Sequence, residues 1–219
     1  MSKQWSVVSA VAVCAAACGF LARWSGVAAP WPIAWVAMVL FALPSFVAAV
    51  RWLGPRNGLG ALAFLSLLAI SIESFGVATG WPYGAFSYSS ALGPKVLGLV
   101  PPTVPFGWIP LVLAAWTISS TRRRFLTALA VLVGFDLIFD PAAVALGFWR
   151  WDVPGPWFGV PWINFFGWAV SGSIGFAVLA AYAHGRPVPP ALRPWLMSGA
   201  AWILAFAAGV WISGGVAPH

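Results

Sequence analysis

Long apolar runs, separated by short polar or Pro- and Gly-rich segments, repeat along the whole chain. Each run has about the length that a helix needs to cross a bilayer, which is about 17–25 residues. A helix is also the element that satisfies all its backbone hydrogen bonds within lipid. The pattern therefore predicts an all-α fold, a polytopic transmembrane helix bundle with about seven spans. They lie roughly at 5–22, 31–52, 59–77, 104–120, 125–148, 162–183 and 194–213.

The composition supports this prediction and limits the choice of partners. Hydrophobic residues make up 62% of the chain and charged residues 7%, whereas a water-soluble domain carries about 25% charged residues. No soluble domain or low-complexity linker separates the runs, so residues 1–219 are expected to form a single integral-membrane domain. The net charge of +7 does not indicate a nucleic-acid partner, because the basic residues are scattered between apolar runs.

The basic residues predict how the bundle is oriented. Eight Lys or Arg residues fall on the side of the N-terminus and three on the other side, which favours a cytoplasmic N-terminus in the cell (inner) membrane. The first run resembles a signal peptide, with one Lys, an apolar centre and small residues. Because so many spans follow it, we expect an uncleaved first helix. The eight basic residues predicted on the side of the N-terminus are Lys3, Arg51, Arg56, Arg122, Arg123, Arg124, Arg186 and Arg193.

Two long connections, residues 78–103 and 149–161, fall on the same predicted side. Both are rich in Trp, Tyr, Phe, Gly and Pro, as in GWPYGAFSY and WRWDVPGPWFGVPW. Such segments turn tightly and suit the membrane interface. Non-helical backbone at that depth has to be covered by protein or line a wet cavity. We therefore expect these connections to form a lid or the mouth of a pocket.

The chain has only four acidic residues, Glu73, Asp136, Asp140 and Asp152. Glu73 lies 14 residues and Asp140 15 residues from the inner ends of their predicted spans, which is roughly 21 and 22 Å at about 1.5 Å per residue. Two parallel spans thus bring Glu73 and Asp140 to nearly the same height, with Asp136 one turn lower. Asp152 lies just beyond that end, so all four acids are expected to converge on one region.

Ionisable groups inside a membrane are costly, by about 2.5–3.5 kcal/mol each, and usually functional. Carboxyls this close in an apolar environment cannot all ionise, so at least one of them is expected to hold its proton. A proton donor then lies beside a proton acceptor. The structural alternative is that the acids cap neighbouring backbone or pair with Arg150 or Lys95.

Two other functions compete with acid–base chemistry. The spacing of Asp136 and Asp140 also suits Mg²⁺ bound through a diphosphate, as in aspartate-rich membrane prenyltransferases. Such enzymes carry two aspartate-rich motifs, whereas this chain has one, and its Arg triplet 122–124 lies at the opposite face. His184 and His219 lie apart near the ends of the last spans, so we predict no metal site. A small proton-coupled transporter would need a polar path to the inner face, where the spans are apolar.

Aromatic residues near the same end favour a third chemistry. The chain has 16 Trp residues, and part of them forms the aromatic belt of a membrane protein. Ring faces also stabilise a cation without attacking it. A protonated carboxyl can protonate an alkene, and a neighbouring carboxylate can then deprotonate a water molecule. The aromatic wall and the acids together predict carbocation chemistry.

Several segments between about residues 70 and 170 resemble the carotenoid 1,2-hydratase (CruF-type) family of carotenoid biosynthesis membrane proteins. They include ESFGVATGWPYGAFSY at 73–88, VPPTVPFGW at 100–108, DLIFDP at 136–141, WRW at 149–151 and GVPWINFFGW at 159–168. The resemblance implies a substrate with an acyclic (ψ) carotenoid end, such as lycopene, γ-carotene or a C50 carotenoid. It also implies addition of water across the terminal C1=C2 bond to give a tertiary alcohol.

This reaction needs an acid, a water molecule and cation stabilisation, and no cofactor is expected. The expected partners are the lipid-soluble carotenoid, water and membrane lipids. Our hypothesis makes Asp140 the proton donor, Asp136 the neighbour that keeps it protonated, and Glu73 the group that positions or deprotonates the water. Asp152 and Asn164 would order the wet mouth of the pocket. The other substrate-binding candidates are Trp81, Tyr83, Trp149 and Trp168.

Overall fold

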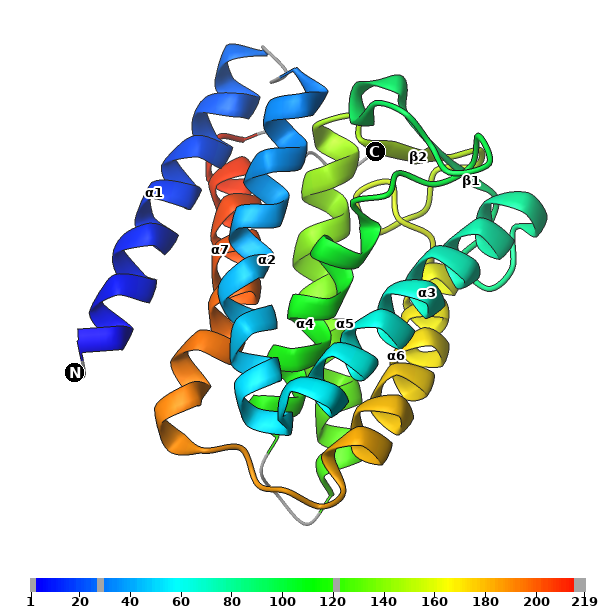
Figure 1. The fold of residues 1–219 in the computed structure, drawn as a ribbon. Coiled ribbons are helices and arrows are strands. Elements are labelled where there is room, and N and C mark those ends of the chain that lie inside the picture. Colours follow the sequence, from blue (N-terminus) through cyan, green and yellow to red (C-terminus); the bar gives the residue numbers. More distant parts are fainter. Residues whose placement is uncertain (1–2, 27–29, 120–122, 215–219) are drawn as a thin grey trace.

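The computed structural model describes residues 3–26, 30–119 and 123–214. These residues contain seven α-helices and two short strands, shown in Figure 1. The strands are β1 (Phe86–Tyr88) and β2 (Trp149–Trp151). The helices are α1 (Lys3–Ser25), α2 (Trp31–Leu53), α3 (Pro55–Thr79), α4 (Val104–Ile118), α5 (Arg124–Ala145), α6 (Trp162–Ala183) and α7 (Arg193–Ile212).

The predicted all-α helix bundle is confirmed, with helix ends close to those that the apolar runs indicate. In the described part of the chain, six helices are long and apolar enough to cross a membrane, so the protein is a multi-pass membrane protein. The orientation of the N-terminus stays a prediction, and Arg122, on which it partly depends, lies outside the described residues.

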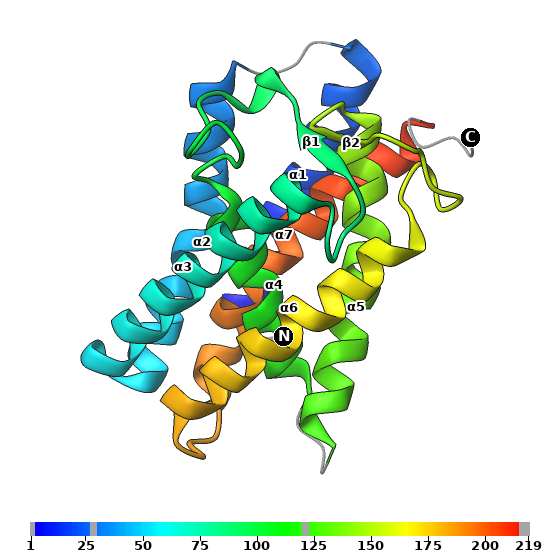
Figure 2. The same ribbon diagram turned by 90° about the vertical axis from the view of Figure 1, so that its right-hand side faces the viewer.

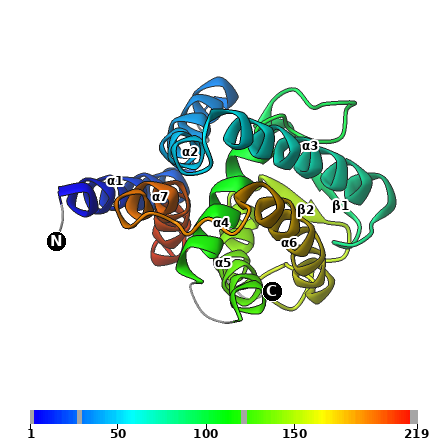
Figure 3. The ribbon, with the colours of Figure 1, turned by 60° about the horizontal axis from the view of Figure 1, so that its bottom comes forward.

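Helix α4 differs from the other six, because it has 15 residues and is buried along nearly its whole length. At about 1.5 Å per residue it spans roughly 22 Å, which is less than the hydrocarbon thickness of about 30 Å. It packs against α2, α3, α5, α6 and α7, and Figure 3 shows it in the middle of the bundle. An apolar helix enclosed on all sides by protein does not have to match the bilayer.

Helix α1 lies at one side of the bundle and packs mainly on α7 (Figure 1). Glycines make this contact close. A Cβ on Gly19 would lie 2.0 Å from the Phe206 carbonyl oxygen, and one on Gly209 would lie 1.9 Å from the Ala16 carbonyl oxygen. Small residues are common where transmembrane helices approach closely, because packing rather than burial from water holds them together.

The two aromatic connections meet at one end of the bundle, which we call the outer end. β1 from the first connection pairs antiparallel with β2 from the second, with Phe86 opposite Trp151 and Tyr88 opposite Trp149. Figure 2 shows the pair across the ends of α3, α5 and α6. The predicted common side is thus confirmed, whereas the strand pairing was not predicted. Tight turns and glycines in both segments hide this short β pattern in the sequence.

Many tryptophans tie elements together rather than only facing lipid. Six indole N–H groups donate to backbone carbonyls far away in the sequence, at 2.8–3.0 Å. Such bonds satisfy the indole N–H where water is absent. Three acceptor carbonyls lie in connections between the α-helices (Tyr83, Leu92 and Pro187), and three lie within α-helices (Val8, Leu137 and Ile138). The donors are Trp35, Trp52, Trp151, Trp157, Trp202 and Trp211.

Candidate functional site

Asp136 and Asp140 lie one turn apart on the buried face of α5, and Asn164 of α6 lies against both. The Asn164 Nδ2 donates to the Asp136 Oδ2 at 2.9 Å and to the Asp140 Oδ2 at 2.6 Å. Asn164 is the third residue of α6, so the helix start places its side chain at the height of the aspartates. One amide therefore holds two carboxyls in a fixed relation.

The two aspartates lie close to each other, because their Oδ2 atoms share the Asn164 Nδ2 and their charges interact. Two carboxylates at this distance in an apolar site repel each other, which favours one proton held between them. Asp136 is 0% exposed and Asp140 3% exposed. The Asp136 Oδ1 is buried and has no hydrogen-bond partner among the described residues. The pair is thus suited to hold one proton, and it has an oxygen that can accept a further hydrogen bond.

Glu73 faces this pair from α3 with its own partner. The Tyr88 hydroxyl donates to the Glu73 Oε2 at 2.9 Å. Glu73 is close enough to both aspartates for their charges to interact. The structure therefore brings Glu73, Asp136 and Asp140 together, as their equal depth predicts. We call these three residues with Asn164 the acid cluster.

Neither of the basic residues considered as partners reaches the acid cluster. Lys95 donates instead to the backbone carbonyl of Tyr88, and Arg150 is exposed on β2. The hydrogen bonds that the described residues donate to the cluster come from Tyr88 and from Asn164 itself. The acids are thus held by neutral donors rather than by ion pairs.

Asp152 does not join the acid cluster. Successive side chains of a strand point to opposite faces. The buried side chain of Trp151 therefore leaves Asp152, the next residue, exposed at the outer end. The expected convergence of all four acids is thus correct for three of them. Asn164 is correspondingly deeper than the wet mouth that we expected it to order, since it is 2% exposed.

Tyr83 reaches down toward the acid cluster from the first connection. Its ring lies between two helices at glycines: a Cβ on Gly167 of α6 would lie 2.2 Å from the Tyr83 Cδ1, and one on Gly76 of α3 would lie 2.7 Å from its Cδ2. Its hydroxyl lies near the Ser171 hydroxyl, and it interacts with the charges of all three acids. Burial and the nearby Glu73 raise the pKa of Tyr83 well above its usual value. Tyr83 is therefore a protonated neighbour of the site.

The remaining aromatic candidates occupy different environments. Trp168 is buried on α6. Trp149 is half-buried and lies edge-on to Tyr88 and Phe139, with ring centroids 5.7 and 5.6 Å apart. Trp81 is 52% exposed and packs on Phe75. Trp149 is thus connected to Glu73 through Tyr88, whereas Trp81 faces out of the bundle.

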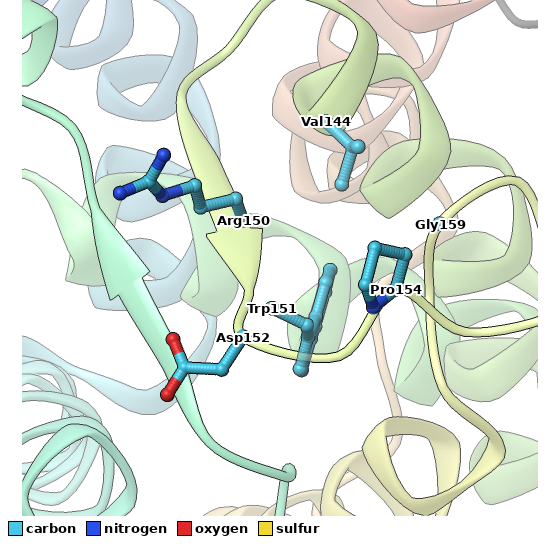
Figure 4. Close-up of a pocket in the computed structure, with 6 residues that line it drawn as sticks. All are labelled: Val144, Arg150, Trp151, Asp152, Pro154 and Gly159. Atoms are coloured by element: carbon cyan, nitrogen blue, oxygen red, sulfur yellow. The ribbon is translucent and has the colours of Figure 1, made fainter.

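Two hollows lie in the outer connections, above the acid cluster. The first has a volume of about 490 Å³. Figure 4 shows Arg150 and Asp152 on one side of β2 and Trp151 on the other. The second, of about 350 Å³, is lined by Gly84, Ala85, Ile163 and the 153–156 turn. Both share Trp151 and Pro154, and neither is lined by the three acids.

Three residues at the site were not singled out from the sequence as site residues: Tyr88, Ser171 and Trp151. Tyr88 follows Phe86 at the spacing of one strand face, which is a signal only once β1 is recognised. Ser171 lies seven residues after Asn164, two helical turns along the same face of α6. That periodicity was available in the sequence, but it does not reveal Tyr83 as the partner.

The described residues offer no metal site of the usual kind. No three His, Cys, Asp or Glu residues among them are arranged to hold a metal ion. Glu73 is engaged by Tyr88, and the two aspartates share Asn164. What the arrangement can do is hold and transfer a proton inside an apolar bundle.

Comparison with known proteins agrees with the resemblance of the motifs. The chain is 46% identical over 128 residues to the bisanhydrobacterioruberin hydratase of Haloarcula japonica. That alignment covers 54% of this chain and 43% of the relative, so the chain spans less than half of the relative's length. No solved structure matches the chain.

A family described as carotenoid biosynthesis protein matches residues 33–218. The match leaves out α1 and includes α3, α5, α6 and both outer connections. Because it runs through every element that builds the acid cluster, the chain belongs to the carotenoid biosynthesis protein family.

Proposed function

We propose that this protein is a carotenoid hydratase. It adds water across the terminal C1=C2 double bond of an acyclic carotenoid end and produces a tertiary 1-hydroxy carotenoid. The observation that carries the proposal is the pair Asp136 and Asp140, which is buried inside an apolar bundle and held by one amide nitrogen of Asn164. The name of the Haloarcula japonica relative, a hydratase, supports the same class of reaction.

The reaction begins with proton transfer from Asp140. The π electrons of the C1=C2 bond take this proton at C2, which leaves a tertiary cation at C1. Asp136 keeps the proton on Asp140 until the alkene arrives, because two carboxylates at this distance repel each other. General acid catalysis of this kind contributes about 10²–10⁴-fold to a rate.

Water then completes the addition. Its oxygen forms a bond to C1, and the resulting oxonium loses a proton to the Glu73 carboxylate. Return of that proton to Asp140 restores the enzyme, so the net reaction consumes one alkene and one water and needs no cofactor. Tyr88 holds the carboxyl that receives the proton.

The aromatic residues stabilise the cation between these two steps. Tyr83, Trp149 and Trp168 present rings near the acid cluster, and ring faces attract a cation without forming a bond to it. Asn164 acts as a positioning residue for the two aspartates. We assign Asp152 to the wet outer end, where it is exposed, and keep Trp81 as a lipid-facing contact of the substrate.

The substrate class follows from the apolar setting. A long polyene such as lycopene, γ-carotene or a C50 carotenoid dissolves in the bilayer and meets the site from within it. We place the protein in the cell membrane, as a single integral-membrane domain with a cytoplasmic N-terminus. Its partners are the carotenoid, water and membrane lipids.

One experiment tests the reaction directly. The protein is expressed in cells that make lycopene, in medium containing ¹⁸O-labelled water, and the pigments are analysed by mass spectrometry. We expect a new tertiary alcohol that carries the label, and none with the Asp140→Asn variant inserted at the same level. Absence of any new polar carotenoid, or oxygen derived from O₂, would contradict the proposal.

A further inference from the structure

The proposed reaction consumes water, yet the two aspartates are closed to the solvent outside the bundle. Asp136, Asp140 and Asn164 are buried, whereas Glu73 is half-buried, and the outer connections cover the ends of the helices that carry these residues (Figure 2). The water that reacts must therefore pass through one part of this enclosure. The inner half of the bundle and its outer end differ in polarity.

The inner half of the bundle is a poor route for water. The residues of α4 from Ile109 to Thr117 are buried and almost all apolar. Leu132 of α5 lies one turn below Asp136 and packs on Gly172 of α6. Below that level, Phe176 and Leu179 continue the apolar face of α6. Water has few polar partners in such packing, and the buried polar groups of Trp116, Thr117 and Ser119 lie at the inner end of α4, away from the acid cluster.

The outer end offers polar groups in sequence. The hollow of about 490 Å³ carries the charged side chains of Arg150 and Asp152 (Figure 4). It shares Trp151 with the second hollow. The Trp151 indole N–H donates to the Tyr83 carbonyl at 2.9 Å, and both side chains are buried. Trp151 and Tyr83 thus form the partition between the hollows and the acid cluster.

Polar groups continue on the inner side of this partition. The Tyr83 hydroxyl lies near the Ser171 hydroxyl, and Tyr83 interacts with the charges of Glu73, Asp136 and Asp140. The Asp136 Oδ1 is buried without a hydrogen-bond partner among the described residues. Buried carboxyl oxygens nearly always accept a hydrogen bond, and a water molecule is a donor that fits here.

We propose that the reacting water reaches the acid cluster from the outer hollows, past Trp151 and Tyr83, and that the Tyr83 and Ser171 hydroxyls bind it last before the carboxyls. This inference rests on the proposed function. It makes Tyr83 a positioning residue for water as well as one of the rings that stabilise the cation. Gly76 and Gly167 are then needed because only a residue without Cβ leaves space for the Tyr83 ring.

Cysteine labelling tests the route without any carotenoid. Cys14 and Cys18 are replaced by Ser, and Ser171→Cys provides a single buried thiol next to Tyr83. A small, membrane-impermeant thiol reagent is added to one face of sealed vesicles at a time. We expect slow labelling from the face that carries the 149–161 connection. Labelling should become at least about tenfold faster with Tyr83→Ala, which opens the partition.

The control variant is Tyr182→Ala, which also removes a tyrosine side chain, but at the inner end of α6. It should leave the labelling rate unchanged. If Tyr83→Ala does not fold, Trp151→Phe keeps a ring but removes the bond to the Tyr83 carbonyl. Its control is Trp202→Phe, another buried indole that donates to a backbone carbonyl. The route would be overturned by an equal rate of labelling from the opposite face. It would also be overturned if neither Tyr83→Ala nor Trp151→Phe changed the labelling rate.

Product analysis then separates the water route from the hydratase proposal. A C1 cation that is not captured by water loses a proton from a neighbouring carbon and returns to an alkene. In D₂O, Tyr83→Phe should therefore raise the ratio of deuterated alkene to alcohol several-fold, while Tyr182→Phe should not. An unchanged ratio contradicts the role of the hydroxyl. If the unmodified protein forms neither the alcohol nor the deuterated alkene, the hydratase proposal is contradicted. The water route is then tested by the cysteine labelling alone.

Discussion

Asn164 on α6 donates a hydrogen bond of 2.6 Å to Asp140 on α5, and the same nitrogen donates to Asp136 at 2.9 Å. One neutral amide thus fixes two carboxyls that are one helical turn apart. Such a bridge holds the pair close enough to share a proton and adds no charge of its own to an apolar bundle. The proposed chemistry depends on this relationship more than on any single acid.

The bridge predicts the effect of changing Asn164. Asn164→Leu keeps a side chain of similar size but removes both donors, so we expect hydratase activity to fall by about 100-fold. Asn164→Asp replaces the donor by a fourth acid in the cluster and should be at least as damaging. Alcohol formation from lycopene in isolated membranes measures both. Asn164→Leu with full activity would show that the bridge has no catalytic importance.

The acids themselves should differ in the step that they support. Asp140→Asn removes the proposed proton donor and should abolish both alcohol formation and deuterium exchange into the substrate in D₂O. Glu73→Gln removes the proposed acceptor of the water proton, so alcohol formation should fall by about 10²-fold or more while exchange persists. Mass spectrometry of the recovered carotenoid measures both quantities. Exchange that survives in Asp140→Asn would assign the donor role elsewhere.

Tyr88 is expected to matter through its hydroxyl rather than its ring. Tyr88→Phe removes the bond to the Glu73 Oε2 but keeps the edge-on contacts with Phe86 and Trp149. We expect stability to fall by only about 1 kcal/mol and activity by about tenfold, since one hydrogen bond to a charged group is worth about 1.5–3 kcal/mol. Thermal unfolding in detergent and the pigment assay measure the two effects. A large loss of stability without loss of activity would make Tyr88 purely structural.

The tyrosines also predict a pH behaviour. Burial, followed by the nearby Glu73, raises the pKa of Tyr88 well above its usual value of 10.0, and the same causes act on Tyr83. A raised folded-state pKa favours the neutral phenol, so its stabilising contribution is present below pH 10 and is lost as pH rises above it. Absorbance at 295 nm should show neither phenol ionising below pH 10. Ionisation of Tyr83 or Tyr88 near pH 10 in the folded protein would contradict the burial of these rings.

The glycines that clasp Tyr83 can be tested by adding one methyl group. A Cβ at residue 167 would lie 2.2 Å from the Tyr83 ring, so Gly167→Ala should displace Tyr83 and lower both stability and activity. Gly107→Ala is the control, because a Cβ there meets no atom within 4 Å and Ala favours a helix by roughly 0.5–1 kcal/mol. Thermal unfolding should therefore shift down for the first variant and stay level or rise for the second. Equal shifts in the unfolding temperature of the two variants would mean that the close contact between Gly167 and Tyr83 does not contribute to stability.

The sequence by itself determined the all-α bundle, because lipid leaves backbone groups no partner except each other and apolar runs of the required length mark each helix. Rise per residue also placed Glu73 and Asp140 at one depth, since that calculation needs only span boundaries. The special position of α4 was not predictable in this way. Its run is apolar like the others, and only the neighbours around it show that it is enclosed by protein.

Only the tertiary structure decided what touches the acids. Asn164 and Ser171 lie on α6, and Tyr88 lies on β1. Their contacts depend on the rotation of α3, α5 and α6 about their axes and on the pairing of β1 with β2. The same pairing turned Asp152 outward, although depth alone placed it with the other acids. The depth of a residue follows from one helix at a time. The direction in which its side chain points depends on contacts between elements, and a hydrogen bond requires both the right depth and the right direction.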